Sequence, residues 1–408
     1  MSGSGPRAAP GWVRRLWRAP APRATLVGML RHQRGQVTAE YLGMLLLVAL
    51  IVGALVVAGP AQKIAGEAVR AVCQIAGGAC TGAPAPPVDR EAVARAAADL
   101  EGLLAGDPDP TAVAAFFRGL EPAVAEALAH ERPELVGNLD GAPIPLRYTA
   151  NAEAIDDEIA RLRAARVPDS DSRLRKLIEL DDPDRRFLLF DPAGDGRAAE
   201  VFGDLTSARH VAVVVPGMNN DLNNFTGGDA ERVHHQASQF DPDQVATIQW
   251  LGYDTPEGAS ALSSSDAKPG AEALPQFVAG IRAQRAERLH WTVVGHSYGS
   301  LVTGMAESGQ GLEVDETVLI GSPGVGVNSA DELGDGNVWV GLARFDPVGY
   351  SEWHGLNPHS RAFDATRFHT GDISGHSSYF NEGSESLRNI GLIAAGYLDE
   401  VNVNDGLF

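Results

Sequence analysis

The pentapeptide GHSYG at residues 295–299 limits the fold of this chain more than any other stretch. It is a G-x-S-x-G pattern that directly follows the apolar run WTVV and precedes SLVTGMAE, whose apolar spacing is helical. A sharp turn from strand to helix crowds the positions two before and two after the serine, so only glycine fits there without a clash. We therefore predict that Ser297 is a nucleophile on such a turn, which Gly295 and Gly299 make possible.

The segments around this turn predict the rest of the fold. From residue 184 onward, short strand-like runs alternate with helical or loop stretches. The first two lie in RFLLFDPAGDGRAAEVFGDL, and the later ones are HVAVVVPGM, VATIQWLGY, LHWTVVGHS, ETVLIGSPG, NVWVGLARFD and ATRFHTGD. Short apolar runs joined by crossovers are typical of buried parallel strands. An antiparallel hairpin that leads into a mostly parallel sheet is the order of an α/β-hydrolase fold, which we predict for residues 184–408.

A serine hydroxyl needs a base to take its proton, and the base needs a carboxylate to orient it. In this fold the acid follows the next-to-last strand and the histidine follows the last one. Asp346 ends the run NVWVGLARFD, and His376 lies between the run RFHT and the final helical stretch SLRNIGLIAAGYL. We therefore predict a triad in which His376 is the base for Ser297 and Asp346 orients it.

Five other residues compete for these roles. Asp364 precedes the last predicted strand, and Asp372 lies in the same loop as the predicted base. His354 and His359 fall before that strand, and His369 falls within it. Their positions fit the chain order less well than those of the predicted triad.

Hydrolysis through a tetrahedral intermediate also needs N–H donors for the oxyanion. The backbone N–H of Tyr298, directly after the nucleophile, is one predicted donor. The other is the N–H of Met218 in the loop VVVPGMNNDLNN, which follows the third predicted strand. Asn219 and Asn220 either line the site or form Asx turns in this loop.

The N-terminal part predicts a membrane attachment. Residues 42–58 form an uncharged run of about 17 residues, near the lower limit for a spanning helix. The first 35 residues contain seven arginines and no acid, so the positive-inside rule places this end in the cytoplasm. We expect a basic cytoplasmic leader over 1–35, a transmembrane helix over 36–62, and a single-pass protein whose catalytic domain is extracellular.

The leader has three interpretations. An ordinary signal peptide has a shorter apolar core, and its best cleavage site here would follow Ala61. An uncleaved membrane anchor is the second interpretation. In the third, RGQVTAEY resembles the class III leader of Flp-type pilins and TadE-like pseudopilins, which implies cleavage after Gly35. Glu40 would then pair with the amino-terminus of a neighbouring subunit, whereas in a plain anchor it faces water at the membrane edge.

Two further segments connect the membrane run to the predicted sheet. Residues 63–88 read as an extracellular linker with two cysteines, Cys73 and Cys80, which form a disulfide or remain free thiols. Residues 89–183 are a predicted helical module, in which apolar residues recur at steps of three and four. Asp89 and Thr111 are the expected N-caps of its first two helices.

Charge and motifs exclude several function classes. Beyond residue 35 the chain carries 26 basic and 53 acidic side chains, a net charge of −27 that would repel a phosphate backbone. We therefore expect no nucleic-acid partner. GSPGVGV lacks the G-x-G-x-x-G spacing of a dinucleotide site, and DPAGDG lacks the ligand pattern of a calcium loop. The side chains of His234 and His235 point in different directions on a helix, so they do not form a metal-binding pair. We therefore expect neither a cofactor nor a metal.

From about Phe116 to Leu398 the chain resembles a bacterial α/β-hydrolase family catalogued as a domain of unknown function. The matching runs are RPELVGNLDGAP, LLLFD, VAVVVPGM, WLGYD, VGHSYGS, GSPGVGV and GHSSYFNEGSESLRNI. The resemblance implies a Ser-Asp-His hydrolase and supports the same three residues, but it implies no substrate.

Together these features predict a membrane-tethered, exported serine hydrolase that cleaves an ester or thioester through an acyl-enzyme. Envelope lipids and small esters are both possible substrates. The alternatives are a serine peptidase and a non-enzymatic binding protein of a pilus or secretion assembly.

Overall fold

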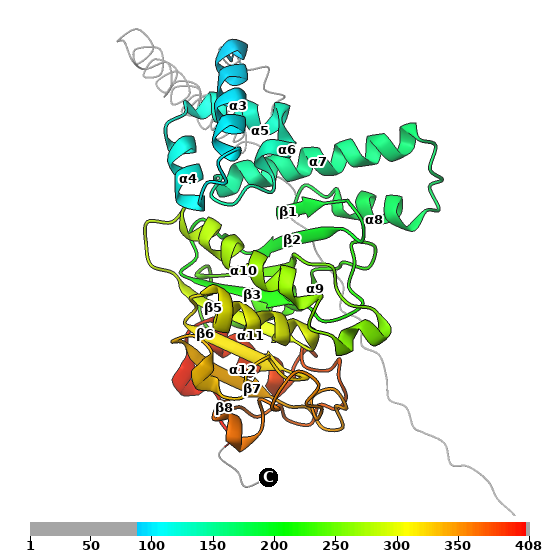
Figure 1. The fold of residues 1–408 in the computed structure, drawn as a ribbon, viewed down its shortest axis with the longest axis vertical. Coiled ribbons are helices and arrows are strands. Elements are labelled where there is room, and N and C mark those ends of the chain that lie inside the picture. Colours follow the sequence, from blue (N-terminus) through cyan, green and yellow to red (C-terminus); the bar gives the residue numbers. More distant parts are fainter. Residues whose placement is uncertain (1–87, 405–408) are drawn as a thin grey trace, which may run out of the picture. The chain divides into compact units, whose positions relative to one another are not determined.

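The computed structural model of the 408-residue chain describes residues 88–404 (Figure 1). The predicted leader with Gly35 and Glu40, the apolar run, and the cysteines Cys73 and Cys80 lie outside the described residues. Within residues 88–404, no helix combines the length and apolarity needed to cross a bilayer.

An eight-stranded sheet forms the centre of the described part. Its order is β1-β2-β4-β3-β5-β6-β7-β8; β1 with β2 and β2 with β4 are antiparallel, and every other pair is parallel. The strands are β1 (Phe187–Asp191), β2 (Arg197–Phe202), β3 (His210–Val215), β4 (Val245–Leu251), β5 (His290–His296), β6 (Glu316–Ile320), β7 (Asn337–Gly341) and β8 (Thr366–Arg367). The prediction of an antiparallel hairpin that leads into a parallel sheet is confirmed.

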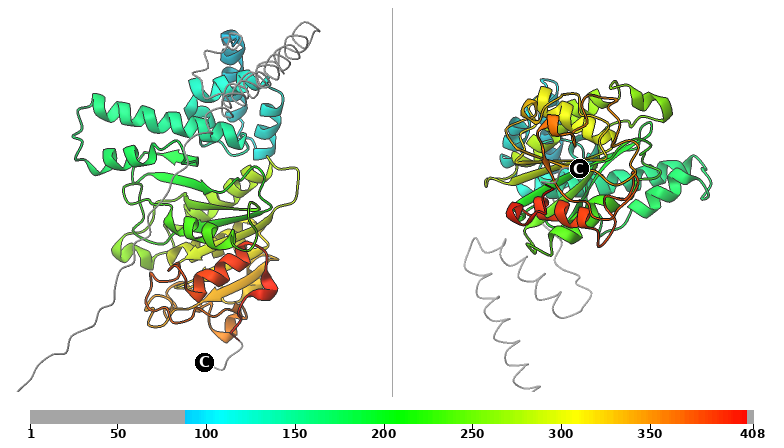
Figure 2. Two further views of the ribbon diagram at one scale, coloured as in Figure 1. Left: turned by 180° about the vertical axis from the view of Figure 1, so that it is seen from behind. Right: turned by 90° about the horizontal axis from the view of Figure 1, so that it is seen from below.

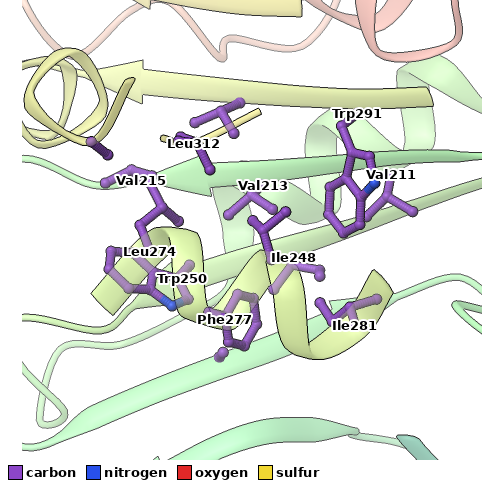
Figure 3. Packing of buried hydrophobic residues seen from close by; sticks show 14 of the residues in the cluster. Val211, Val213, Val215, Ile248, Trp250, Leu274, Phe277, Ile281, Trp291 and Leu312 are labelled. Atoms are coloured by element: carbon purple, nitrogen blue, oxygen red, sulfur yellow. The ribbon is translucent and has the colours of Figure 1, made fainter. Parts of the chain in front are cut away.

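Helices cover both faces of this sheet (Figure 2). Alternate residues of β3 supply the two cores: Val211, Val213 and Val215 pack with α10 (Ala267–Arg282) and α11 (Tyr298–Gln310), as Figure 3 shows for α10. Ala212 and Val214 pack on the other face with α9 (Gly228–Ala237) and α12 (Glu385–Ala394). Short 3-10 helices complete the described chain: η1 (Gly258–Leu262), η2 (Ala330–Glu332), η3 (Arg361–Phe363) and η4 (Leu398–Glu400).

The expected helices precede the sheet: α3 (Arg90–Leu104), α4 (Pro110–Arg118), α5 (Pro122–Glu131), α6 (Pro133–Val136), α7 (Ile144–Ala164) and α8 (Ser172–Leu180). Asp89 caps α3 as predicted, by accepting a hydrogen bond from the N–H of Glu91. The prediction of Thr111 as the next cap is wrong, because Asp109 caps α4. Pro110 takes the first helical position, where a missing N–H costs nothing, and this moves the cap to the residue before it.

Helices α3 to α8 and their connections, here called the helical segment, span residues 90–180. Side chains of this segment cover β1, which is an edge strand of the sheet. Asn138 exchanges two 2.8 Å hydrogen bonds with the backbone N–H and C=O of Phe190. Arg147 donates to Leu188 O at 2.6 Å, and Asn151 donates to Phe187 O at 2.9 Å. These contacts satisfy backbone groups that an edge strand otherwise exposes. Residues 88–404 fall in one compact unit.

Candidate active site

Ser297 lies on the turn between β5 and α11, at φ 57° and ψ −128°, and is only 5% exposed. A Cβ on Gly295 would lie 2.6 Å from Ser300 Cα, and one on Gly299 would lie 2.3 Å from Val215 O. Both glycines are therefore required by close backbone contacts, as the sequence predicts. A serine at positive φ is strained, and such strain is concentrated at functional sites.

Ser297, His376 and Asp346 form a continuous chain of hydrogen bonds. His376 Nε2 lies 2.7 Å from Ser297 Oγ. The other ring nitrogen, Nδ1, lies 2.9 Å and 3.0 Å from the two carboxylate oxygens of Asp346. The structure thus brings together the three side chains that the sequence selected, from three loops at the carboxyl edge of the sheet.

The surroundings of Asp346 hold its carboxylate in place and in its charged form. The backbone N–H groups of Val348 and Gly349 donate to Oδ1 at 2.9 Å and 3.0 Å, and the Tyr379 hydroxyl donates to Oδ2 at 2.6 Å. Burial alone would raise the pKa of Asp346, but the hydrogen bonds from His376, Tyr379 and Gly349 outweigh it and lower the pKa to about 2. The carboxylate therefore stays negative opposite His376 at any neutral pH.

Tyr379 is a site residue that sequence reasoning missed. Its hydroxyl accepts a hydrogen bond from the N–H of Ala343 at 3.0 Å while it donates to Asp346. It therefore fixes the acid to the end of β7. The available signal was its position in GHSSYF, three residues after His376.

His296, the residue before the nucleophile, holds the loop of the base. Its Nε2 donates to the backbone carbonyl of His376 at 2.9 Å, and the two ring centroids are 4.9 Å apart. Burial and the nearby His376 lower the pKa of His296 to about 4. The ring is therefore neutral near pH 7, and it adds no positive charge beside the base.

The sequence predicts that the backbone N–H groups of Met218 and Tyr298 bind the oxyanion. Gly217 packs against the nucleophile so closely that a Cβ on it would lie 2.7 Å from Ser297 Cβ. The next N–H belongs to Met218, and the N–H of Tyr298 opens α11, where it has no intrahelical partner. Within residues 88–404, neither N–H donates to another group of the chain.

Asn220 fixes the orientation of the peptide between Gly217 and Met218. Its side-chain amide donates to Gly217 O at 3.0 Å and to Met218 O at 3.1 Å. Because N–H and C=O point in opposite directions across a trans peptide, this bond sets the direction of the Met218 N–H. Asn219 instead forms a turn at φ 59°, and its N–H donates to Pro256 O.

The competing acids and histidines lie elsewhere. Asp372 pairs with Arg344 at 3.4 Å and is 96% exposed, and Asp364 ends η3 in a left-handed conformation. His354 donates to Ala261 O at 2.8 Å. Burial lowers the pKa of His359 to about 4. The placement of His369 within the last strand is wrong, because β8 ends at Arg367.

The described residues contain no group of three histidine, cysteine or acidic side chains arranged as a metal site. The predicted site consists of side chains and backbone N–H groups that can carry out acid–base and nucleophilic steps.

Comparisons with known proteins agree with this architecture. Residues 191–353 match the sequence profile of a family described as alpha/beta hydrolase, and this segment includes the nucleophile turn and the acid. The fold is that of an α/β hydrolase. The hydrolase domain is preceded here by the helices that cover β1.

Related chains come from mycobacteria. An uncharacterized protein of Mycobacterium tuberculosis is 27% identical over 367 residues, which covers 69% of this chain and 55% of that protein. Another, of Mycobacterium bovis, is 35% identical over 167 residues, or 37% of this chain and 62% of that protein. The chain therefore spans little more than half the length of these relatives.

Solved structures show only a distant likeness. A serine hydrolase without a lid from Xanthomonas campestris is 16% identical, covers 53% of this chain and 95% of that chain, and gives a TM-score of 0.34. A likeness of this level supports no conclusion about activity.

Proposed function

We propose that the chain is a serine hydrolase that cleaves carboxylic esters through an acyl-enzyme. The observation that carries this proposal is the unbroken path from Ser297 Oγ through the His376 ring to Asp346, with 2.7 Å and 2.9 Å contacts. A ring in this position can take the hydroxyl proton at Nε2 while its Nδ1–H remains bonded to the carboxylate.

The reaction has two displacement steps. Ser297 Oγ attacks the ester carbonyl while its proton moves to His376 Nε2, and the oxyanion accepts hydrogen bonds from the Met218 and Tyr298 N–H groups. The C–O bond to the alcohol then breaks, and His376 returns the proton to the leaving oxygen. A water molecule, deprotonated by the same ring, releases the acid and restores Ser297.

The substrate class and cellular setting are also part of the proposal. A nucleophile of this kind can cleave an ester or a thioester, either in a small molecule or in an envelope lipid. The predicted membrane run would tether the domain on the extracellular side. A serine peptidase uses the same machinery. A binding protein of a pilus or secretion assembly remains the non-enzymatic alternative, supported by the pilin-like leader.

Fluorophosphonate labelling tests whether the nucleophile is active. We expect the probe to attach to Ser297 in the folded full chain, and Ser297→Ala to abolish labelling. Ser308→Ala is the matched control, since Ser308 lies on the same helix and hydrogen-bonds only to Gly304 O within the described chain. Absence of labelling in folded protein would contradict the enzyme proposal and favour the binding protein.

Turnover then separates the two enzymatic alternatives. We expect hydrolysis of p-nitrophenyl esters, little hydrolysis of peptide anilides, and loss of activity in His376→Ala. Full esterase activity in that variant would show that another group is the base.

The intact mass of the native protein tests the leader. A mature chain that starts at Gln36 supports the pilin-type cut, a start beyond Ala61 supports a signal peptide, and an untouched N-terminus supports an anchor.

A further inference from the structure

The most exposed apolar side chains of the described chain belong to loops that contain or contact residues of the candidate active site. Phe345 is 83% exposed, Tyr350 59%, Leu262 57% and Trp353 54%. The other large apolar residues classed as exposed in this part of the chain reach at most 43%, at Ile178. Single exposed apolar residues are ordinary on protein surfaces, but a group of the largest ones beside a nucleophile indicates a binding surface.

Two loops carry these four side chains. Phe345, Tyr350 and Trp353 belong to the acid loop, residues 342–365, which joins β7 to β8 and contains Asp346. Leu262 ends η1 in the loop between β4 and α10, which we call the η1 loop.

The two loops meet at Tyr298, the neighbour of the nucleophile. His354 of the acid loop donates to Ala261 O of the η1 loop at 2.8 Å, and its ring lies 5.5 Å from that of Tyr298. The Tyr298 hydroxyl donates to Ser263 O at 2.6 Å. Leu262 and Trp353 are thus each next in sequence to a residue of this junction.

Phe345 is held in an unfavourable conformation that keeps it exposed. It has φ 54°, a left-handed value that is uncommon for a bulky residue. The backbone on either side is fixed, because Arg344 exchanges hydrogen bonds with Ile373 and Gly375, and the Asp346 carboxylate is buried in the triad. A strained backbone and a large apolar side chain in water are both costly, so their combination at one residue favours a functional role.

We propose that these four residues, here called the apolar rim, seat the domain on an uncharged or zwitterionic lipid surface, from which a long-chain acyl ester reaches Ser297. Tryptophan and tyrosine favour the boundary between lipid and water. This inference rests on the proposed esterase function and narrows its substrate class to lipid-borne esters.

Charge and chain length favour a neutral lipid surface as the occupant. The part of the chain beyond residue 35 has a net charge of −27, and Glu257 and Glu352 are exposed on the two loops, whereas the exposed Arg344 beside Phe345 is paired with Asp372 at 3.4 Å. Anionic lipids would therefore be repelled. Only 29 residues separate the end of the predicted membrane run, Ala58, from Val88, and even when extended they reach no more than about 100 Å.

Hydrolysis of the same ester group in two physical forms tests the proposal in the full chain. The soluble form is p-nitrophenyl butyrate below its solubility limit, and the lipid-borne form is p-nitrophenyl palmitate in phosphatidylcholine vesicles. The rim variant is Leu262→Gln/Phe345→Asn/Trp353→Gln, in which asparagine suits the positive φ of residue 345. Ile178→Gln is the control for loss of an exposed apolar side chain outside the rim.

We expect the rim variant to lose about tenfold or more of its palmitate activity and less than about threefold of its butyrate activity, because burial of apolar side chains drives binding to a lipid surface. The control should match the wild type on both esters, and wild type should be slower on phosphatidylglycerol vesicles. All variants share one N-terminus, so the predicted anchor contributes equally.

An equal loss on both esters, or none on palmitate, would overturn the rim proposal but leave the esterase intact. A wild-type chain that hydrolyses neither ester would instead refute the proposed function. A measurement independent of turnover covers that case: brominated phosphatidylcholine should quench the fluorescence of the wild type more than that of Trp353→Phe. Equal quenching would show that Trp353 does not meet lipid.

Discussion

Removal of the Asn220 side-chain amide tests how the oxyanion site is held. In Asn220→Ala the carbonyls of Gly217 and Met218 lose donors at 3.0 Å and 3.1 Å. The Gly217–Met218 peptide then loses the donor at its own carbonyl, and the direction of the Met218 N–H is less well fixed. We expect kcat to fall while KM stays nearly constant, because the oxyanion exists only during reaction.

The hydrogen bond to Gly217 O sets the expected magnitude. A neutral hydrogen bond contributes about 1 kcal/mol net, and only the bond to Gly217 O acts on the peptide that carries the Met218 N–H, because Met218 O belongs to the next peptide. Since about 1.36 kcal/mol corresponds to tenfold in rate, kcat should fall by about fivefold. Complete loss of one oxyanion donor, about 100-fold to 1000-fold, is the upper bound.

The assay compares kcat and KM on a soluble p-nitrophenyl ester for Asn220→Ala, Asn220→Asp and Asn224→Ala. Asn224 is the matched control, since its amide donates at 2.9 Å to Asn219 O in the same loop but not to the critical peptide. The aspartate should be worse than the alanine, because its carboxylate repels both carbonyl oxygens. If Asn220→Ala and Asn224→Ala both keep kcat within about twofold of wild type, the backbone alone holds the peptide and the reasoning is refuted.

Three further variants test other parts of the structure. Tyr379→Phe removes the 2.6 Å hydrogen bond to Asp346, so kcat on the same ester should fall about tenfold, as expected for a bond to a charged group; an unchanged kcat would contradict its positioning role. Glu307 is buried and its pKa is raised from 4.5 to about 7, mainly by burial. Between pH 4.5 and about pH 7 the native state binds more protons than the unfolded state, so the free energy of unfolding falls as the pH rises through this range. Glu307→Gln should be about 3 kcal/mol more stable at pH 8 in urea unfolding and equal to wild type below pH 4.5; equal stability at both would disprove the shift. Arg147→Met leaves the buried Oδ1 atom of Asp140 without its 3.1 Å partner and should cost about 3 kcal/mol, at the low end for a broken buried pair because the Asp140 side chain is 27% exposed; the double variant with Asp140→Ala should recover part of that loss.

The sequence was sufficient for features that depend on local pattern. The GHSYG turn and the alternation of apolar runs predict which strands follow one another along the chain. Position along the chain alone selects His376 and Asp346 from their competitors. These inferences succeed because the turn needs glycine at fixed spacing and because parallel strands must be buried on both faces. The cap at Asp109 was also within reach, since Pro110 marks the first turn of the helix.

Features that depend on distances between loops could not be predicted. His296 reads as a variable position of the turn, and only the fold shows that it holds the carbonyl of His376. Tyr379 likewise acts through a contact across the site. Asn138 and Arg147 read as ordinary helical-segment residues until β1 lies beside them. In each case the partner is fixed by tertiary packing, which no local pattern encodes.

The side chains that cover β1 also determine where mechanical load enters the domain. Tension applied at Val88 would pass along the helical segment and reach the rest of the domain at two places, the outermost strand β1 and helix α10, where the Arg147 guanidinium lies over the Phe277 ring. Strands β2, β4 and β3 lie between that strand and β5, which carries the nucleophile turn. Neither entry point lies at the turn of Ser297 or the loop of His376, so we expect stretching to strain the contacts of the helical segment before it changes the spacing between these two residues.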